Sequence, residues 1–506
     1  MKQSKLSCRL LCVLLVLSML LLPVLMTGCA EDTSDGDKQN SDTTPGNTGT
    51  TPSTDEDPEE TIVYTATTVP DGLDLGDAEF RILVYDNTNS TWYDVDFAAT
   101  GYTSDIINDA AYKRMVQVEE ELNTDIVSYP SPGYGFDYMN TAVSAGDDLY
   151  DTGIVCARKA VTLAERGFLY NLNSDDIVLD TEAPWWDQGC TSGLSVANKL
   201  YMIAGDISIL YRKSLRAYYF NKQLAADHED LPNMYELVEN GEWTLEALAE
   251  CVTAVSRDLN GDDEMTGDDL YGLIYTVDTM GTGLIGAGVQ IVTKDEDDIP
   301  ELTFYNDDTV LAFDMITEII YDFDHSITSG DRPNEAGVGV MFPGNQALFN
   351  NCELHNIATF RSMETDFGIL PTPKFDEYQE QYRSIMNPVP AGMIVIPVTN
   401  DINIDNTCYV LDSLGAASKN ILTPAYIDTY LEGRAARDEE SRESLNIIFN
   451  NVVFDLGYIY NWGNIATFSY DLVRQKATNF TSAYEKIAEA AQTKMEETLA
   501  IYESLE

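Results

Sequence analysis

Apolar and polar positions along the first part of the globular region switch between two periods. Residues 78–85 alternate in the way typical of a strand, and residues 104–122 carry apolar side chains at helical spacing. The succession continues with a strand at 125–129, a helix at 134–145 and a strand at 151–156. Because strands alternate with helices, this pattern predicts an α/β fold around a mostly parallel sheet.

A long apolar run, residues 10–26, precedes this region. Lys2, Lys5 and Arg9 stand before the run, and Thr27-Gly28 separates it from Cys29. This order resembles a bacterial lipoprotein signal. The resemblance implies that residues 1–28 are a removed signal peptide and that a lipid on Cys29 anchors the chain at the extracellular face of the cell membrane. An uncleaved membrane anchor is the alternative, because the run approaches the roughly 18 residues that suggest a span.

Residues 31–60 consist largely of Ser, Thr, Asp, Gly and Pro and have no apolar periodicity. Such a segment cannot bury a core, so we expect it to be disordered. Residues 29–70 are therefore assigned to a lipidated tether and residues 71–506 to the folded region.

The charge and the cysteine content of the chain argue against nucleic-acid binding and against a disulfide-rich fold. The chain has 85 acidic and 29 basic residues and a formal charge of -56, which argues against a nucleic-acid partner. Beyond Cys29 five cysteines remain without close spacing, so no disulfide framework is predicted. They are Cys156, Cys190, Cys251, Cys352 and Cys408.

Short motifs in a fixed order follow in the rest of the chain. They are Trp185-Trp186-Asp187, the runs GLSVANKLYMIAGD at 193–206, YYFNKQL at 218–224 and LVENGEWTLE at 237–246, and later ALF at 347–349, DFGILPTP at 366–373 and AGMIVIP at 391–397. This order resembles the extracellular solute-binding proteins of ABC importers, the family that includes maltose-binding protein. Asn198 stands where the family's "GKLY" element has glycine.

The resemblance implies a two-lobed, periplasmic-binding-protein type II fold with a hinge and an interlobe cleft. By analogy, lobe 1 comprises about 71–205 and 363–430, and lobe 2 about 206–362 and 431–506. It further implies a monomer that delivers its solute to ABC transporter permease subunits and catalyses no reaction.

Several side chains fall where the cleft is expected. Sugar sites combine flat aromatic rings with hydrogen-bonding groups, and ligands of α/β sheets lie beyond the carboxyl ends of strands. The candidate ligand-binding residues are Trp92, Tyr93, Arg158, Trp185, Trp186, Asp187, Asp206, Asn345 and Trp462. The competing interpretation for each Trp is packing in the core, which we prefer for Trp243 because it opens an amphipathic helix.

An oligosaccharide is the leading ligand hypothesis. A peptide or another solute, a surface enzyme acting on glycans, and an adhesin are the alternatives. The chain has three histidines and lacks the HExxH, GxSxG and GxxxxGK[ST] motifs, so three common enzyme classes lose their signatures. Paired carboxylates for glycoside hydrolysis remain open, because 85 acidic residues produce accidental pairs.

An acidic segment, residues 258–269, has the ligand spacing of an EF-hand loop. Oxygen-bearing residues fall at positions 1, 3, 5, 7, 9 and 12 of this loop. They are Asp258, Asn260, Asp262, Glu264, Thr266 and Asp269. Asp263 occupies position 6, where glycine is usual, and Asp tolerates the left-handed conformation better than most residues. The loop predicts a structural Ca²⁺ site, against the alternative of a solvated acidic turn.

Overall fold

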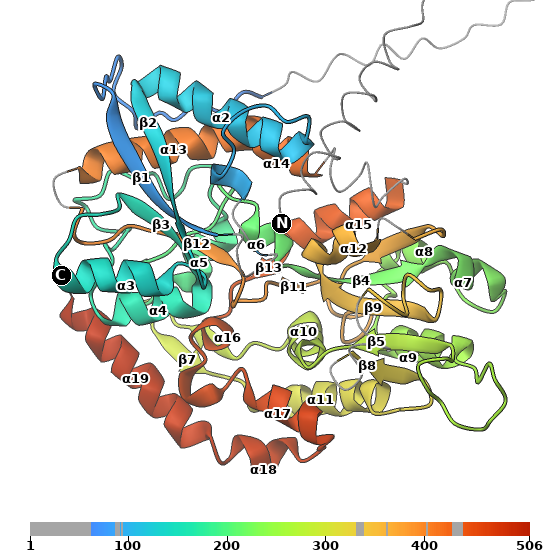
Figure 1. Ribbon diagram of the computed structural model, residues 1–506. Coiled ribbons are helices and arrows are strands. Elements are labelled where there is room, and N and C mark those ends of the chain that lie inside the picture. The colour runs from blue at the N-terminus through green and yellow to red at the C-terminus, as the bar shows by residue number, and fades with distance from the viewer. Residues whose placement is uncertain are drawn as a thin grey trace, which may run out of the picture. The chain divides into compact units, whose positions relative to one another are not determined.

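Two mixed β-sheets organise the part of the chain that the structure describes (Figure 1). A computed structural model describes residues 62–86, 92, 95–329, 339–360, 363–400, 403–427 and 439–505. Residues 62–506 cluster as one compact unit. Within the described residues no helix combines the length and the apolar character needed to cross a membrane.

The first sheet has the strand order β12-β3-β1-β2. Its strands are β1 (Ala78–Tyr85), β2 (Thr124–Ser131), β3 (Thr152–Cys156) and β12 (Gly392–Val395). The strand β1 runs parallel to β2 and β3, whereas β12 returns antiparallel to β3. The three strands and two helices predicted in this part of the chain are confirmed, with ends displaced by at most two residues. Asp105 caps the first of these helices by accepting from the amides of Ile107 and Asn108.

The second sheet has the order β10-β4-β9-β5-β8. Its strands are β4 (Arg216–Asn221), β5 (Tyr271–Tyr275), β8 (Ser326–Thr328), β9 (Ala347–Glu353) and β10 (Phe367–Leu370). Strands β5, β8 and β9 are parallel, and β4 is antiparallel to both β9 and β10. Because β10 pairs with β4, residues 367–370 belong to the second sheet, which corrects the assignment of 363–430 as a whole to lobe 1.

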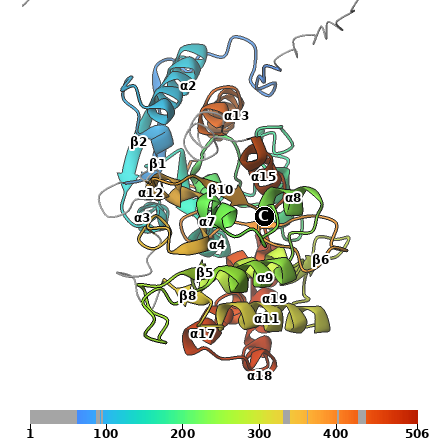
Figure 2. The same cartoon turned by 90° about the vertical axis from the view of Figure 1, so that its right-hand side faces the viewer.

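Helices cover both sheets. Around the first sheet α2 (Ile106–Leu122) packs on α13 (Ile404–Asn420), and α3 (Phe136–Ala145) packs on α4 (Ala157–Glu165). On the second sheet α9 (Leu245–Val255) and α11 (Asp307–Ile320) lie side by side against β5 and β8 (Figure 2). The remaining elements are η1 (Val95–Phe97), α5 (Gln188–Leu194), α6 (Leu210–Lys213), α7 (Lys222–Asp227), α8 (Met234–Glu239), α10 (Asp278–Gly286), β6 (Val292–Lys294), β7 (Pro300–Leu302), η2 (Leu354–Asn356), α12 (Ile357–Phe360), β11 (Ser384–Ile385), α14 (Leu422–Pro424), α15 (Glu439–Asn450), β13 (Val452–Val453), α16 (Leu456–Tyr460), η4 (Trp462–Asn464), α17 (Phe468–Gln475), α18 (Phe480–Tyr484) and α19 (Ala488–Ser504).

Crossing segments connect the two sheets. Residues 204–215 lead from the first sheet to β4, residues 371–391 lead from β10 back to β12, and residues 451–455 join α15 to α16. The second and third of these segments pair through the short parallel strands β11 and β13. The two sheets are therefore joined by adjacent backbone segments, which is the arrangement that a hinge between lobes requires.

The segment 62–75, here called the strap, belongs to the folded unit. The Tyr64 amide donates to Asn420 Oδ1 (2.9 Å), and Asn420 Nδ2 donates back to the Tyr64 carbonyl (2.8 Å). The Thr68 hydroxyl donates to Asp412 (2.7 Å). These bonds hold the strap on α13, so residues 62–70 are not part of the predicted tether. Earlier residues, including Cys29, lie outside the described residues.

Candidate functional site

Polar and aromatic side chains follow the carboxyl ends of strands in both sheets. In the first sheet, β1 leads toward Trp92 and β3 leads into α4 with Arg158. In the second sheet, β5 leads to Asp278 at the start of α10, and β9 ends at Glu353. Since β4 is antiparallel to β9, its first residue pairs with the last residue of β9, as the register Arg216↔Glu353 shows. We call Trp92, Arg158, Arg216, Asp278, Glu353 and His355 the junction cluster.

A buried guanidinium organises the second-sheet side of the cluster. Arg216 is 1% exposed and donates to Glu353 Oε1 (2.8 Å), to the Thr276 hydroxyl (3.0 Å) and to the carbonyl of Asn351 (3.0 Å). Asp278 Oδ2 lies 3.9 Å from Arg216 Nη1. A buried charge needs such pairing, because removing it from water without partners costs several kcal/mol.

The carboxylate of Glu353 connects this guanidinium to the return crossing. Asn387 Nδ2, which lies just before β12, donates to Glu353 Oε1 (3.1 Å). Burial alone would raise the pKa of Glu353, but Arg216 and the Asn387 amide lower it by more, so the net shift is downward. Glu353 is therefore an ionised acceptor that retains 16% side-chain exposure.

The first-sheet side contributes a cation and an aromatic ring. Arg158 Nη2 donates to the Tyr458 carbonyl of α16 (2.7 Å), and the pKa of the Tyr458 phenol responds to Asp278, Arg158 and Arg216. Burial is the main cause that raises this pKa to about 12. Arg158 thus contacts α16, whose Tyr458 also lies within electrostatic reach of Asp278 and Arg216.

Trp92 lies against His355, with ring centroids 4.1 Å apart and planes inclined by 24°. Burial, helped by the nearby Lys213 and partly opposed by Glu353, lowers the pKa of His355 to about 4. At neutral pH the imidazole is therefore uncharged. The stack joins a residue that follows β1 to a residue that follows β9, and so it spans the junction of the two sheets.

Two predicted stacking residues are core side chains instead. Trp185 is 3% exposed and Trp186 is 2% exposed. Both indole N–H groups donate to Oδ1 of Asp412 at 3.3 Å. Neither ring offers a face to a ligand in this arrangement, which corrects their prediction as stacking platforms. A buried Trp needs an acceptor for its N–H, and the carboxylate on α13 supplies it.

Trp462 is also buried, at 4% exposure. Its Nε1 donates to the Thr498 hydroxyl of α19 (2.8 Å), which donates to the Glu165 carboxylate of α4 (2.6 Å). The ring therefore secures the last helix against α4 and is not placed to stack on a ligand. Lys199, from the predicted "GKLY"-like run, supports the same helix by donating to the Tyr502 carbonyl (2.7 Å) near its end.

The other predicted ligand residues have structural partners too. Asp187 caps α5 by accepting from the Cys190 amide (3.1 Å). Asp206 is 3% exposed and pairs with Arg212 (2.9 Å).

Asn345 lies at the amino end of β9, where its side-chain oxygen accepts from Asn221 Nδ2 (2.6 Å). That end lies opposite the junction cluster, because Asn221 is the last residue of β4 and Arg216 the first. Tyr93 lies outside the described residues.

The acidic loop 258–269 is closed by its own backbone amides. Asp258 Oδ1 accepts from the amides of Asn260 (3.0 Å) and Gly261 (2.7 Å). Asp263 has φ 64°, the left-handed conformation that position 6 of the predicted loop requires. Amides of Leu259 and Thr266 lower the pKa of Asp269. Within the described residues no group of three or more His, Cys, Asp or Glu is placed to hold a metal ion.

Calcium binding at this loop stays a prediction. We expect millimolar Ca²⁺ to raise the melting temperature by about 2–5 °C over an EDTA-treated sample, because a ligand bound at a hundred times its Kd stabilises by about 2.7 kcal/mol. Differential scanning calorimetry measures the shift. Asp262→Asn is the control, because the Asn side chain still accepts from the Glu264 amide, as Asp262 does at 3.0 Å, but carries no charge. An equal shift in this variant, or no shift in the parent, would contradict the prediction.

Solved structures with the same arrangement of sheets decide the fold. No family model and no curated protein matches the chain. The ABC substrate-binding protein Lmo0181 from Listeria monocytogenes, in complex with cycloalternan, matches 85% of this chain and 99% of its own at a TM-score of 0.50 and 14% identity. The chain has the type II fold of solute-binding proteins.

Two further solved structures match this chain over a similar length. The maltose-bound T. maritima MalE3 matches 82% of this chain and 99% of its own, at a TM-score of 0.51 and 13% identity. UgpB from Mycobacterium tuberculosis, in complex with glycerophosphocholine, matches 83% and 99%, at a TM-score of 0.53 and 14% identity. The match extends over most of the chain.

Proposed function

We propose that this chain is an extracellular solute receptor of an ABC importer, which binds an oligosaccharide between its lobes and delivers it to the permease. The observation that carries the proposal is the fold match over four fifths of the chain, with two reported neighbours named for bound carbohydrate. These neighbours are binding proteins, and the proposal accordingly assigns the chain no catalytic reaction.

The chemistry of the junction cluster supports a ligand rich in hydroxyl groups. Asp278 and Glu353 are carboxylates with 24% and 16% side-chain exposure, and they can accept hydrogen bonds from hydroxyls. Arg158 can donate, and Trp92 supplies a flat ring for the C–H face of a sugar. Because these residues come from both sheets, a ligand that contacts them all favours the closed arrangement of the lobes.

Membrane attachment is part of the proposal. The support is the sequence order of basic residues, apolar run and Cys29, followed by a polar segment that precedes the strap at residue 62. In this account, lipid on Cys29 anchors the receptor and residues 31–60 hold the folded unit away from the membrane surface. Mass spectrometry of the membrane fraction tests it: the mature N-terminus should be a lipidated Cys29, whereas an intact residue 1 would favour the uncleaved anchor.

A second candidate ligand class is a small polar solute that is not an oligosaccharide. UgpB, named in complex with glycerophosphocholine, has the same fold at a comparable similarity. A peptide, or the role of a glycan-acting enzyme or adhesin, has no comparable support among the neighbours described above. Ligand screens should therefore include glycerophosphodiesters beside glycans.

The location of the binding site can be tested by substitution. We expect Trp92→Ala and Arg158→Ala each to weaken binding of the best oligosaccharide about tenfold or more, because truncating a hot-spot residue, often Trp or Arg, costs about 2 kcal/mol. Isothermal titration calorimetry measures the change. Trp185→Phe is the matched control, since that ring is buried against Asp412: it should lower stability and leave affinity unchanged. Unchanged affinity in both cluster variants would place the ligand elsewhere.

A further inference from the structure

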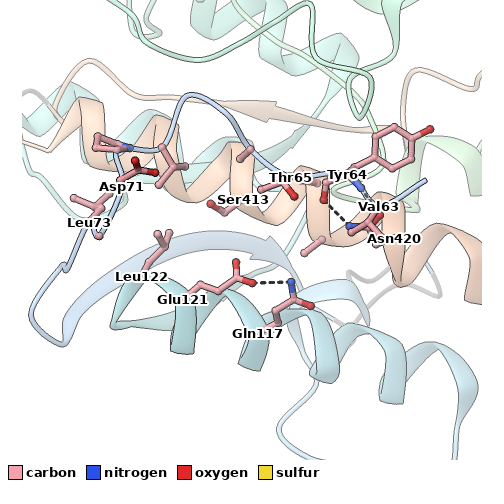
Figure 3. Close-up of a pocket in the computed structure, with 16 residues that line it drawn as sticks. Val63, Tyr64, Thr65, Asp71, Leu73, Gln117, Glu121, Leu122, Ser413 and Asn420 are labelled. Carbon is pink, nitrogen blue, oxygen red and sulfur yellow. Dashed lines mark hydrogen bonds between the residues drawn. The ribbon is translucent and has the colours of Figure 1, made fainter. Parts of the chain in front are cut away.

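The strap is connected to the first crossing segment through a lysine. Lys419, near the end of α13, has its Nζ 5.0 Å from the centre of the Tyr64 ring and 3.2 Å from Asp206 Oδ2. The strap holds Tyr64 in place by the two-way bond with Asn420, which Figure 3 shows together with the neighbouring cavity of about 390 Å³. One cation therefore contacts both the strap and the crossing.

Asp206 is the residue at which the chain leaves the first sheet. The preceding Gly205 pairs with Trp186, and the Asp206 amide donates to the Trp185 carbonyl (2.8 Å). Its carboxylate accepts from Arg212 (2.9 Å), Lys419 (3.2 Å) and Thr423 (2.7 Å). Three donors from different segments thus fix the start of residues 204–215, a crossing that must change when the lobes rotate.

The Asp206 carboxylate is connected to the second sheet through Arg212. Arg212, which pairs with Asp206, has its guanidinium carbon 5.2 Å from the centre of the Phe449 ring. Phe449 lies on α15, which packs on β10 of the second sheet. A continuous series of contacts therefore runs from Tyr64 through Lys419, Asp206 and Arg212 to an element of the second sheet.

We propose that the strap braces the hinge. With Tyr64 docked, Lys419 is held over the ring and against Asp206, and the first crossing segment keeps the conformation seen here. When the strap detaches, Lys419 loses its aromatic partner, the restraint on Asp206 weakens, and the two sheets sample a wider range of separations.

The test needs no ligand, so its outcome is independent of the receptor function proposed above. It uses residues 62–506, which form one compact unit. Hydrogen exchange of the amides of residues 206–214 reports local opening of the crossing. Spin labels at Ser144→Cys on α3 and Asp314→Cys on α11, both exposed, report the distance between the sheets. The five native cysteines of this unit are buried and should not be labelled.

We expect Lys419→Met to accelerate exchange at residues 206–214 about tenfold or more, as for loss of one charge-assisted hydrogen bond. The distance distribution should broaden. Tyr64→Leu leaves the backbone bonds of residue 64 to Asn420 possible, and it should act in the same direction with a smaller effect. Lys419→Arg keeps the positive charge, so its exchange rates and distance distribution should match those of the parent. The proposal is overturned if Lys419→Met leaves the crossing amides and the distances unchanged, or if it accelerates all amides equally through global destabilisation.

Discussion

Replacement of Arg216 by Met is expected to lower the free energy of unfolding by about 3–5 kcal/mol. The guanidinium is almost wholly buried and donates to Glu353, to the Thr276 hydroxyl and to the Asn351 carbonyl. Without it, the half-buried Glu353 carboxylate keeps its amide donors but loses the guanidinium, and breaking a buried ion pair by removing one partner is strongly destabilising. Urea unfolding followed by circular dichroism measures the change.

Arg474→Met is the matched control for this substitution. Arg474 also forms an ion pair, with Asp471 at 2.9 Å, but the two side chains are 58% and 65% exposed. Exposed pairs contribute about 0–1 kcal/mol, so the control should unfold almost like the parent. Equal losses in the two variants would mean that the Arg216 network does not hold the junction together.

Replacement of Asp412 by Leu is expected to cost about 3–5 kcal/mol of stability at pH 7. The carboxylate accepts from Trp185, Trp186, the Thr68 hydroxyl and the Asp180 amide. The substitution leaves these buried or half-buried donors without an acceptor, and each such group costs about 1–3 kcal/mol. Urea unfolding measures the loss. A loss below about 1 kcal/mol would show that the donors find other acceptors.

The loss at Asp412 should depend on pH. Burial is the main cause that raises the pKa of Asp412 from 3.8 to about 6, against the lowering effect of its donors. Between these values the folded protein binds the proton more tightly than the unfolded chain. The contribution of Asp412 protonation to the free energy of unfolding is therefore fully present below about pH 4, and it is lost as the pH rises through 6.

The stability difference between the parent and Asp412→Leu should accordingly widen by about 2–3 kcal/mol when the pH falls from 7 to 4. Comparing the two proteins cancels the titration of other carboxyl groups whose environment is unchanged. Thermal unfolding at several pH values measures the difference. A constant difference across this range would contradict the raised pKa of Asp412.

The fold could be predicted from the sequence because its signals are local and repeated. The apolar-rich run at residues 78–85 matches the bounds of β1, and the helical spacing of apolar residues in 104–122 locates α2 within two residues. The order of motifs indicated the solute-binding fold. The placement of β10 was missed, because pairing between residues 367–370 and β4 depends on contacts distant in sequence.

The candidate site was predicted only in part. Arg158 and Trp92 follow strands of the first sheet, where the rule about carboxyl ends of strands predicts ligand contacts, and their role in binding stays a prediction. In the second sheet, Glu353 ends the strand ALFNNCE, and its pairing with Arg216 depends on contacts distant in sequence. Trp185, Trp186 and Trp462 were overvalued because residue type alone does not distinguish a ring that packs in the core from one that meets a ligand. Their buried acceptors, Asp412 and Thr498, are distant in sequence.

The receptor account is tested most directly by calorimetric titration of residues 62–506 with neutral oligosaccharides, glycerophosphodiesters and peptides, followed by chromatography of the mixtures. The account predicts saturable binding of at least one oligosaccharide, with Kd of about 1 μM or below and the ligand recovered intact. Binding confined to peptides, or the appearance of cleaved sugar products, would contradict it.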